Sequence, residues 1–315
     1  MFLGDFMFKY SLDNKRYYTL NYYYQKKYGS KVFKVSLNAG FTCPNIDGTK
    51  GVGGCSYCLN GSGEKVTTNN LVDQFNKVKE VMLKKWPTSK YIGYFQANTN
   101  TYAPLSELKE KYETILKLDG VVGLNIATRA DSITPEVYDY LEELNKRTDL
   151  VIELGLQTIN EKTAKLINRC STLDEFEKCL EELNKRNINV VVHIINGLPY
   201  ETKEDMINTA KYLSNKKILG IKIHMLHILK DTNMFREYLK NPWHILSREE
   251  YVDIVCDQLE YLREDIVINR ITGDPIKEEL VEPDWLVKKF GVLNEIDKEM
   301  VRRDSYQGKK YYSNE

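Results

Sequence analysis

The sequence predicts an α/β fold, built as an open or partial barrel of six βα units. From about residue 33 onward, short β-branched runs alternate with longer segments of helical period, and this alternation is typical of βα units on a parallel sheet. The chain has 315 residues, of which 42% are hydrophobic, so it holds enough apolar mass for one large domain or two modest ones. The same apolar content excludes an intrinsically disordered chain.

The expected elements follow one another in a regular order. The strands are placed at 32–37, 91–96, 121–127, 150–156, 189–195 and 220–226. The helices between them are placed at 69–85, 105–118, 135–146, 172–186 and 203–215. Capping signals support two of these helices, because Thr134 and Pro135 supply an N-cap and a first-turn proline, and Thr202 is followed three residues later by the acidic Asp205.

We expect three parts along the chain. Residues 1–30 form a basic, tyrosine-rich N-terminal segment, residues 31–230 form the barrel, and residues 231–315 form a C-terminal extension that caps it. The alternation lapses in the extension, where we expect a helix at 247–262, a strand at 266–272 and a short helix at 292–303.

The N-terminal segment combines positive charge with aromatic rings. Over residues 1–34, seven basic side chains stand against two acidic ones, a net charge of +5, although the whole chain has 45 of each. Seven tyrosines are interleaved with those charges: Tyr10, Tyr17, Tyr18, Tyr22, Tyr23, Tyr24 and Tyr28. Basic side chains with stacking rings suit single-stranded or looped RNA. The alternative is an amphipathic segment whose tyrosines pack on the domain.

No segment has the features of a membrane span or a secretory signal. His193 and Asn196 interrupt the apolar run that begins at Val190, and nothing approaches the roughly 20 apolar residues that span a bilayer. The first ten residues contain Asp5 in their only apolar stretch and lack both a basic n-region and a cleavage site. We therefore expect a cytoplasmic protein with no membrane partner, and the oligomeric state is left open.

Three of the six cysteines gather just after the first expected strand. Cys43, Cys55 and Cys58 fall within sixteen positions, at the end of the strand where the chemistry of such barrels lies. No fourth zinc ligand is near, since the next cysteine is Cys170 and the first histidine is His193. Three cysteines suit an iron–sulfur cluster that leaves one iron open to a small molecule. A zinc site completed by a distant residue and a packing role are the alternatives.

The spacing Cys43-x11-Cys55-x2-Cys58 after the first strand of a βα barrel resembles the radical S-adenosylmethionine (SAM) superfamily, in a variant with a widened first spacing. Within it, the chain is similar to the YhcC/YtqA-type bacterial radical SAM proteins, which are related to the catalytic subunit of Elongator. The segments that carry this resemblance span nearly the full length: 31–34, 39–45, 47–50, 153–158 and 272–274. The chain is too short for the acetyltransferase domain of the Elongator subunit, so acetyl transfer is not implied.

The resemblance implies a partial (β/α)6 TIM-type barrel of the radical SAM kind, with a 4Fe-4S cluster on Cys43, Cys55 and Cys58 and with SAM on the open iron. In that chemistry a reduced cluster passes an electron to the sulfonium, and the C–S bond breaks to give a 5′-deoxyadenosyl radical. An external one-electron reductant is therefore an implied partner. The protein has to orient the cofactor and exclude water.

The resemblance also implies the contacts of SAM with the protein. Tyr57, just before the third cysteine, is expected beside the adenine. Gln96 stands where the superfamily usually has a Gly-Gly-Glu-like motif that meets the amino group. Arg169 is the candidate for the SAM carboxylate.

Two further pairs complete the expected SAM site. Glu153 and Gln157 end the fourth strand, and both are expected to hold the ribose hydroxyls, since they alternate inward with the period of a strand. Asn196 and Leu198 lie in a turn after the fifth strand that resembles the adenine-contacting turn of the family.

Candidates for substrate contact or catalysis lie at the ends of the third and sixth strands. His224 and His227, with Lys222 nearby, face the place expected for the substrate, and their alternative is an ordinary role in the core. Arg129 and Asp131 lie at the same rim, where the alternative is a salt bridge that closes the mouth. The other cysteines are expected to be buried helix residues: Cys170, Cys179 and Cys256.

The function implied by the resemblance is hydrogen abstraction from a nucleic acid, with tRNA as the first candidate. Kinship to the Elongator subunit implies chemistry at C5 of a wobble uridine, and the YtqA-type group suggests remodelling of a carboxymethylaminomethyl side chain. An anticodon base can be splayed out and stacked, although the balanced overall charge weighs slightly against RNA. One alternative is a radical SAM enzyme that acts on a peptide or small metabolite. The other is a non-catalytic RNA-binding module whose cysteines hold a structural zinc ion.

Overall fold

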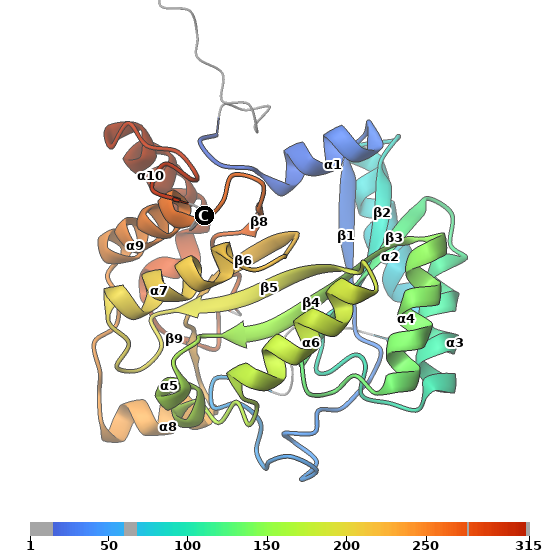
Figure 1. The fold of residues 1–315 in the computed structure, drawn as a ribbon, viewed down its shortest axis with the longest axis horizontal. Coiled ribbons are helices and arrows are strands. Elements are labelled where there is room, and N and C mark those ends of the chain that lie inside the picture. The colour runs from blue at the N-terminus through green and yellow to red at the C-terminus, as the bar shows by residue number, and fades with distance from the viewer. Residues whose placement is uncertain (1–14, 60–67, 276, 313–315) are drawn as a thin grey trace, which may run out of the picture.

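A seven-stranded parallel sheet forms the body of the molecule (Figure 1). The computed structural model describes residues 15–59, 68–275 and 277–312. The strand order in space is β1-β2-β3-β4-β5-β6-β8, and every pairing is parallel. The strands are β1 (Val32–Leu37), β2 (Lys90–Phe95), β3 (Val121–Thr128), β4 (Asp149–Gln157), β5 (Asn189–Asn196), β6 (Gly220–Met225) and β8 (Val267–Arg270).

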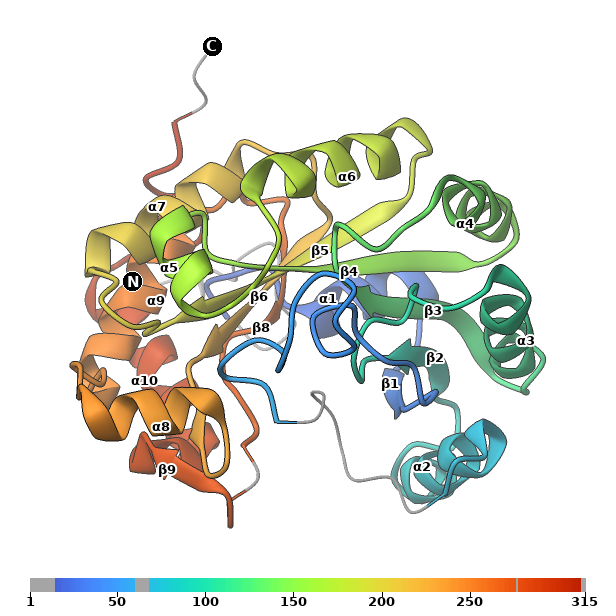
Figure 2. The same cartoon turned by 90° about the horizontal axis from the view of Figure 1, so that it is seen from below.

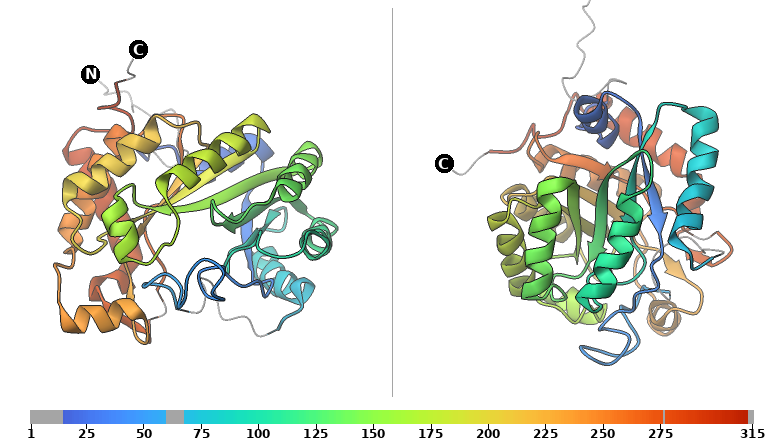
Figure 3. Two further views of the ribbon diagram at one scale, coloured as in Figure 1. Left: turned by 60° about the horizontal axis from the view of Figure 1, so that its bottom comes forward. Right: turned by 90° about the vertical axis from the view of Figure 1, so that its right-hand side faces the viewer.

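Helices connect the strands and cover the outer face of the sheet (Figure 3). Those between consecutive strands are α2 (Leu71–Lys85), α3 (Leu105–Leu116), α4 (Pro135–Arg147), α5 (Glu161–Leu166), α6 (Leu173–Lys185) and α7 (Lys203–Ser214). The other elements are α1 (Leu20–Tyr28), β7 (Ile228–Leu229), α8 (Asn233–Lys240), α9 (Arg248–Tyr261), β9 (Leu280–Glu282), the 3-10 helix η1 (Asp284–Lys288) and α10 (Lys289–Arg302). Of the helices in the described part of the chain, none is long and apolar enough to cross a membrane.

The predicted partial barrel is confirmed, and the elements of its six βα units fall within two residues of their expected bounds. The sheet has one strand more than six units supply. The strand expected at 266–272 is β8, which pairs in parallel with β6 and so extends the barrel. The short helices α1, α5 and α8 were not predicted, because a helix of two turns leaves too little periodic pattern to recognise.

The sheet curls into an open arc with β1 and β8 at its two edges (Figure 2). Side chains alternate between its faces. The outward residues of the strands are apolar, as Val35, Leu124 and Ile223 illustrate, and they form one core with the covering helices. The inward residues line the interior of the barrel. Several of them are polar, so the inner face of the sheet is not an ordinary hydrophobic core.

Helix α1 closes the amino end of the barrel, opposite the loop that carries the three cysteines (Figure 1). It contacts β1 and β8, and Tyr24, only 6% exposed, packs with Val32 and Ile92 inside this end. The Tyr28 hydroxyl donates a hydrogen bond to Asp149 at the start of β4. For the described tyrosines, the packing alternative therefore describes the segment better than an exposed RNA-binding surface. Tyr10 lies outside the described residues.

The C-terminal helices pack on one another and on the barrel. Helix α9 contacts both α7 and α10. Arg303, just after α10, pairs with Asp257 of α9 at 2.7 Å, and Lys310 pairs with Glu260. These basic side chains near the C-terminus are therefore engaged by acidic partners within the fold.

Truncating the ring that plugs the amino end tests this account of α1. We expect Tyr24→Ala to lower the free energy of unfolding by about 3–5 kcal/mol, because a buried aromatic side chain would leave a cavity. Urea unfolding measures the loss. The control is Tyr200→Ala, since Tyr200 is 67% exposed and its removal should change stability by about 0.5 kcal/mol or less. Equal effects of the two changes would contradict a buried plug.

Candidate active site

The cysteine loop (residues 38–59) follows β1 at the carboxyl end of the sheet. Backbone hydrogen bonds fix it to two other parts of the chain. The Ser56 N–H donates to the Ile167 carbonyl at the end of α5 (2.9 Å), and the Ser56 carbonyl accepts from the Met234 N–H at the start of α8 (2.8 Å). The loop is therefore held between segments that follow β4 and β6, over the mouth of the barrel.

The three cysteines lie in one electrostatic neighbourhood. Burial raises the pKa of the Cys55 thiol, the nearby guanidinium of Arg129 opposes that rise, and Cys43 adds to it. The Tyr57 hydroxyl forms a hydrogen bond with the Cys55 sulfur. The pKa of this phenol is raised well above its usual value, mainly by burial and also by the charges of Cys55 and Cys58. The loop thus brings the predicted ligands together beside a fixed positive charge.

This donor set fits an iron–sulfur cluster. The Asn45 side-chain N–H lies 3.6 Å from the Cys55 sulfur, and such hydrogen bonds to sulfur, with nearby charge, tune clusters. Across residues 15–59, 68–275 and 277–312, no three His, Cys, Asp or Glu side chains converge on a position for one metal ion. A cluster has no need of such convergence, because its cysteines bind different iron atoms.

A fourth cysteine lies against the cysteine loop. Cys170 is half-buried in the connection between α5 and α6, with a left-handed φ of 55°. A Cβ placed on Gly51 would come within 2.8 Å of the Cys170 sulfur, so the two segments are in close contact. The expectation of a buried helix residue is therefore wrong for Cys170, whereas Cys179 in α6 and Cys256 in α9 are buried as expected.

Arg169 braces the mouth of the barrel. Its guanidinium is 2% exposed and donates to the carbonyls of Leu156 and Thr158 at 2.7 and 2.8 Å. It also pairs with Glu161 at 3.1 Å. This arginine thus ties the end of β4 to the segment after α5, a different environment from the open SAM-carboxylate site expected for it.

Arg129 and Asp131 form the salt bridge considered as their alternative. The guanidinium meets both carboxylate oxygens at 2.9 and 2.8 Å and donates to the Arg169 carbonyl at 2.8 Å. Asp131 also lies 3.5 Å from the Lys50 ammonium of the cysteine loop. Both guanidinium groups act on the charge of Cys55, but Arg129 also acts on Cys43, and its side chain is 12% exposed against 2% for Arg169. Arg129 is therefore better placed than Arg169 to meet an anionic group beside the cysteines.

Tyr57 and Leu198, both expected near the adenine, meet in one apolar cluster. This cluster joins the cysteine loop to the ends of β5 and β6, and its buried members are Ile167, Leu198, Leu226, Ile228 and Met234. Tyr57 packs against it as a partly buried ring. An apolar wall beside the cysteines is what a flat heteroaromatic group requires.

The side chains of the other residues expected to contact SAM do not all point into the mouth of the barrel. The Asn196 side chain points outward and makes two hydrogen bonds with Gln258 of α9, at 2.8 and 2.9 Å, so only the backbone of its turn faces the mouth. Gln157 adopts a left-handed φ of 63° at a bulge. Its amide lies over Gly155, where a Cβ would approach Nε2 to 2.5 Å. Gln96, half-buried, follows the carboxyl end of β2.

A layer of polar side chains crosses the middle of the barrel interior. Glu153, 1% exposed, accepts hydrogen bonds from Lys34 (2.9 Å), Asn125 (2.6 Å), His193 (2.7 Å) and Lys222. Each of the seven strands contributes one member to this polar layer, namely Lys34, Tyr94, Asn125, Glu153, His193, Lys222 and Asn269. Protein donors occupy both oxygens of Glu153, so this carboxylate has no oxygen left for the ribose hydroxyls. We therefore propose the ribose contact for Gln157 alone.

The electrostatics of the polar layer are set by burial. Burial would raise the pKa of Glu153, but the ammonium groups of Lys222 and Lys34 hold it well below its usual value. Burial lowers the pKa of Lys222 to about 7, against the attraction of Glu153. It also lowers the pKa of His193 to about 4, so this imidazole is neutral near pH 7.

Above the polar layer, toward the cysteine loop, the inward residues keep partial exposure, so solvent reaches this part of the interior. The next inward residues along the six main strands are all partly exposed, namely Ser36, Gln96, Ala127, Gly155, Ile195 and His224. Ser36 and Ala127 have short side chains, so they leave room between the polar layer and the cysteines, whereas the Gln157 amide covers Gly155. We call this space the chamber.

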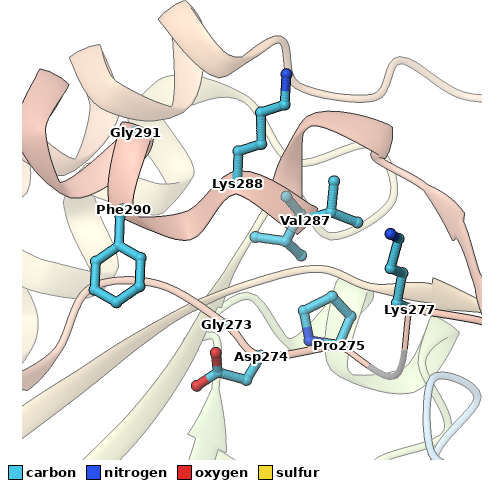
Figure 4. Close-up of a pocket in the computed structure, with 9 residues that line it drawn as sticks. Gly273, Asp274, Pro275, Lys277, Val287, Lys288, Phe290 and Gly291 are labelled. Atoms are coloured by element: carbon cyan, nitrogen blue, oxygen red, sulfur yellow. The ribbon is translucent and has the colours of Figure 1, made fainter.

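His224 and His227 lie at the wall and rim of the chamber. The Nε2 atom of each is buried and has no partner among the described residues. His227 lies against Gly273, where a Cβ would come within 2.1 Å of Nε2. A pocket of about 290 Å³ lies beside Gly273, within the C-terminal extension. Asp274 lines one side of it, and Val287 and Phe290 line the other (Figure 4).

Sequence reasoning missed most of the polar layer. Lys34, Tyr94, Asn125, His193 and Asn269 were not selected as site residues. Their signal is a polar residue at an inward position in the middle of a mainly apolar strand, as in the runs VFKVSL, VVGLNIAT and NVVVHIIN. Any one of these residues is unremarkable by itself, and only the closure of the sheet places them together.

Comparisons with known proteins place the chain in a family. Residues 48–213 match the family described as "Radical SAM superfamily", and residues 218–302 match "Radical_SAM C-terminal domain". "Uncharacterized protein YtqA" of Bacillus subtilis is 49% identical over 96% of this chain and 95% of its own. "Protein YhcC" of Escherichia coli is 29% identical over 87% of this chain and 88% of its own.

A solved structure shares the fold. The Elp3 protein of the archaeon Methanocaldococcus infernus, with an N-terminal deletion, superposes with a TM-score of 0.67 at 17% identity. The match covers 88% of this chain and 64% of the Elp3 chain, slightly under two thirds of it.

Loss of one cysteine tests the ligand assignment. We expect Cys55→Ala to abolish both the brown colour of anaerobically purified protein and its cleavage of SAM on reduction, because a cluster with two cysteines is not retained. Iron and sulfide analysis together with detection of 5′-deoxyadenosine measures both losses. Cys256→Ala, in α9, is the matched control and should keep both properties. Survival of either property in Cys55→Ala would contradict the assignment.

Neutralising Glu153 tests the polar layer. We expect Glu153→Gln to lower the free energy of unfolding at pH 7 by about 3–5 kcal/mol, since it leaves buried ammonium groups without their counter-charge. The pKa of Glu153 is lowered in the folded state. Its contribution is therefore complete above pH 4.5 and is lost as the pH falls through the lowered pKa. Urea unfolding at pH 7 and pH 3.5 should show the difference between variant and parent shrinking at the lower pH.

The matched control for this change is Glu142→Gln on α4. Glu142 forms a surface pair with Lys146, and such pairs contribute about 1 kcal/mol or less. A loss as small for Glu153→Gln as for Glu142→Gln would show that the polar layer carries no buried charge pair.

Proposed function

The chain belongs to the radical SAM superfamily, and we propose that it is a tRNA-modifying enzyme that remodels a carboxymethylaminomethyl substituent at C5 of a wobble uridine. Members of the superfamily use a 4Fe-4S cluster and SAM. When bound, these cofactors supply the 5′-deoxyadenosyl radical that abstracts hydrogen from the substrate. The chain itself supplies ligands, orientation and a closed reaction space.

We assign these tasks to particular residues. Cys43, Cys55 and Cys58 hold the cluster in the cysteine loop. Tyr57 and Leu198 offer the apolar wall for the adenine. The remaining SAM contacts in the proposal are Gln96, Gln157, the backbone of the turn at Asn196, and Arg129.

Exclusion of water and of stray hydrogen donors follows from the shape of the barrel. Helix α1 closes the amino end with buried tyrosines, and the cysteine loop lies over the carboxyl end. In the proposal, the part of the C-terminal extension that contains α8, β9 and η1 caps this end, and the substrate enters the chamber from the rim at His224 and His227. A sealed space of this kind protects a radical from quenching.

The observation that carries the tRNA proposal is the combination of sequence resemblance and fold. The chain resembles the relatives of the Elongator catalytic subunit over nearly its whole length, and it shares its fold with an archaeal Elp3. A "probable threonylcarbamoyladenosine tRNA methylthiotransferase" of Methanocaldococcus jannaschii is also 28% identical over 53% of this chain. These similarities favour a base in RNA as the group that reaches the chamber.

A peptide or small metabolite as substrate is the second candidate. A relative named "Ribosomal protein uS12 methylthiotransferase RimO" is 24% identical over 52% of this chain. The fold also superposes on methylornithine synthase with a TM-score of 0.52. A non-catalytic RNA-binding module with structural zinc is a weaker candidate, because membership of the family implies an enzyme.

Mass analysis of tRNA nucleosides tests the proposal. We compare cells that contain the gene, cells that lack it, and cells that carry only the Cys55→Ala protein. The expected result is accumulation of a carboxymethylaminomethyl-type uridine in the last two strains, because its side chain is no longer remodelled. Identical uridine profiles in all three strains would sink the tRNA proposal and turn attention to peptides and metabolites.

A further inference from the structure

The polar layer holds more positive than negative charge. Lys34 and Lys222 are its two cations, whereas Glu153 is its one anion. His193 is neutral near pH 7, and Arg270, which lies nearby on β8, is already paired with Asp274 at 2.9 Å. When Lys222 is protonated, the layer is therefore one negative charge short. A buried charge without a counter-ion is costly, and burial accordingly lowers the pKa of Lys222 to about 7 in the free protein. An anion bound beside this amine would supply the missing counter-charge and keep it protonated.

The basic side chains of the polar layer are accessible from the chamber and not from the closed amino end of the barrel. Side chains of Lys34, His193 and Lys222 are 14%, 18% and 8% exposed, and the inward residues above them are small or partly exposed. On the other side, Val32, Ile92 and Tyr24 of α1 form an apolar cluster without space for a ligand. A small anion that reaches the layer must come from the mouth.

The layer also offers hydrogen-bond capacity that the protein does not use. The Lys222 ammonium donates to Glu153 and to the Tyr94 hydroxyl, which leaves the third proton of this ammonium. The Nε2 atom of His224, one step above Lys222 on β6, is buried and has no partner among the described residues. Lys222 and His224 are successive inward residues of β6, so both groups lie on the face that a substituent entering from the rim would meet.

We propose that the polar layer is the carboxylate-binding floor of the substrate chamber: Lys222, supported by Lys34, pairs with a carboxylate at the far end of the substrate, while the carbon to be attacked is held higher, beside the SAM site. This inference rests on the proposed function, since it explains how a uridine substituent ending in a carboxylate is recognised. A carboxylate suits the single missing charge. A backbone phosphodiester does not, because chain atoms on both sides prevent it from entering the barrel end-on.

Binding of the anion is coupled to a proton. Burial holds the pKa of Lys222 near 7 in the free protein, and a carboxylate beside the amine raises it. Binding near pH 8 is therefore accompanied by uptake of a proton on Lys222. The titratable groups that face this amine or its partner Glu153 are Tyr24 (α1), Lys34 (β1), Tyr94 (β2), His193 (β5), His224 (β6) and Arg270 (β8). Burial holds His193 and His224 neutral at this pH, so neither supplies the change.

The test compares acid and amide probes on the anaerobic holoenzyme with SAM bound. One pair is 5-carboxymethylaminomethyluridine and its carboxamide, and the other is acetate and acetamide. Calorimetric titration at pH 8 gives the affinity and, in two buffers of different ionisation enthalpy, the protons taken up. We expect the parent to bind each acid at least about tenfold more tightly than its amide, a preference of about 1.4 kcal/mol, with proton uptake for the acids only.

Variants locate the preference. Lys222→Met should reduce the acid-to-amide preference to within about twofold and abolish proton uptake. Lys34→Met is a second variant on a different strand, and it should weaken the preference while keeping the proton signal. Lys146→Met, at an exposed position of α4, is the matched control and should behave as the parent. Thermal unfolding verifies that each variant is folded before it is titrated.

The outcomes separate this inference from the proposed function. A parent that prefers neither acid, or a Lys222→Met protein that keeps the preference, overturns the carboxylate site, even if the uridine profile in cells depends on the enzyme. A parent that prefers acetate and takes up a proton, but does not bind the modified nucleoside, supports the carboxylate site and counts against the wobble uridine.

Discussion

The buried carboxylate of Glu153 is the interaction on which the interior of the barrel depends. It receives donors from four different strands, β1, β3, β5 and β6. Two of these strands, β1 and β6, do not pair with β4, so the carboxylate links parts of the arc that share no backbone pairing. Desolvating a carboxylate is tolerated only when its oxygens are satisfied and an opposite charge is near. Lys34 and Lys222 meet that condition. Together they replace the apolar layer that fills a closed TIM barrel with a polar floor on which a chamber can open.

The two ends of the barrel have separate tasks. At the amino end, α1 places Tyr24 against Val32 and Ile92 and closes the interior with apolar surface. At the carboxyl end, the cysteine loop is fastened to α5 and α8 through Ser56, and Arg129 faces the cysteines with a fixed positive charge. The residues that stabilise the barrel and the residues that form the site therefore lie at opposite ends, because rigid packing at the amino end allows the loops at the carboxyl end to be shaped for a ligand.

Two polar side chains near the mouth, those of Arg169 and Asn196, are engaged by hydrogen bonds within the fold. Arg169 is occupied by backbone carbonyls at the end of β4, and Asn196 by the amide of Gln258. The resemblance to the family leads us to expect both residues at the SAM site. Their hydrogen bonds hold neighbouring loops in register around the cysteines, so they support the site from behind it.

The sequence by itself determined the βα order, the bounds of the main strands and helices, and the cysteine motif, because these depend on residues close together in the chain. Alternating apolar runs identify strands wherever they occur, and the spacing from Cys43 to Cys58 is a local pattern. Only the tertiary structure decided that β8 joins the sheet, that Tyr24 plugs its end, and that Lys34, Glu153 and Lys222 meet. Those three residues lie far apart in the chain, and their interaction depends on the register and curl of seven strands. The charge of the barrel interior, and with it the kind of group it can receive, is therefore a property of the curled sheet and not of any segment within it.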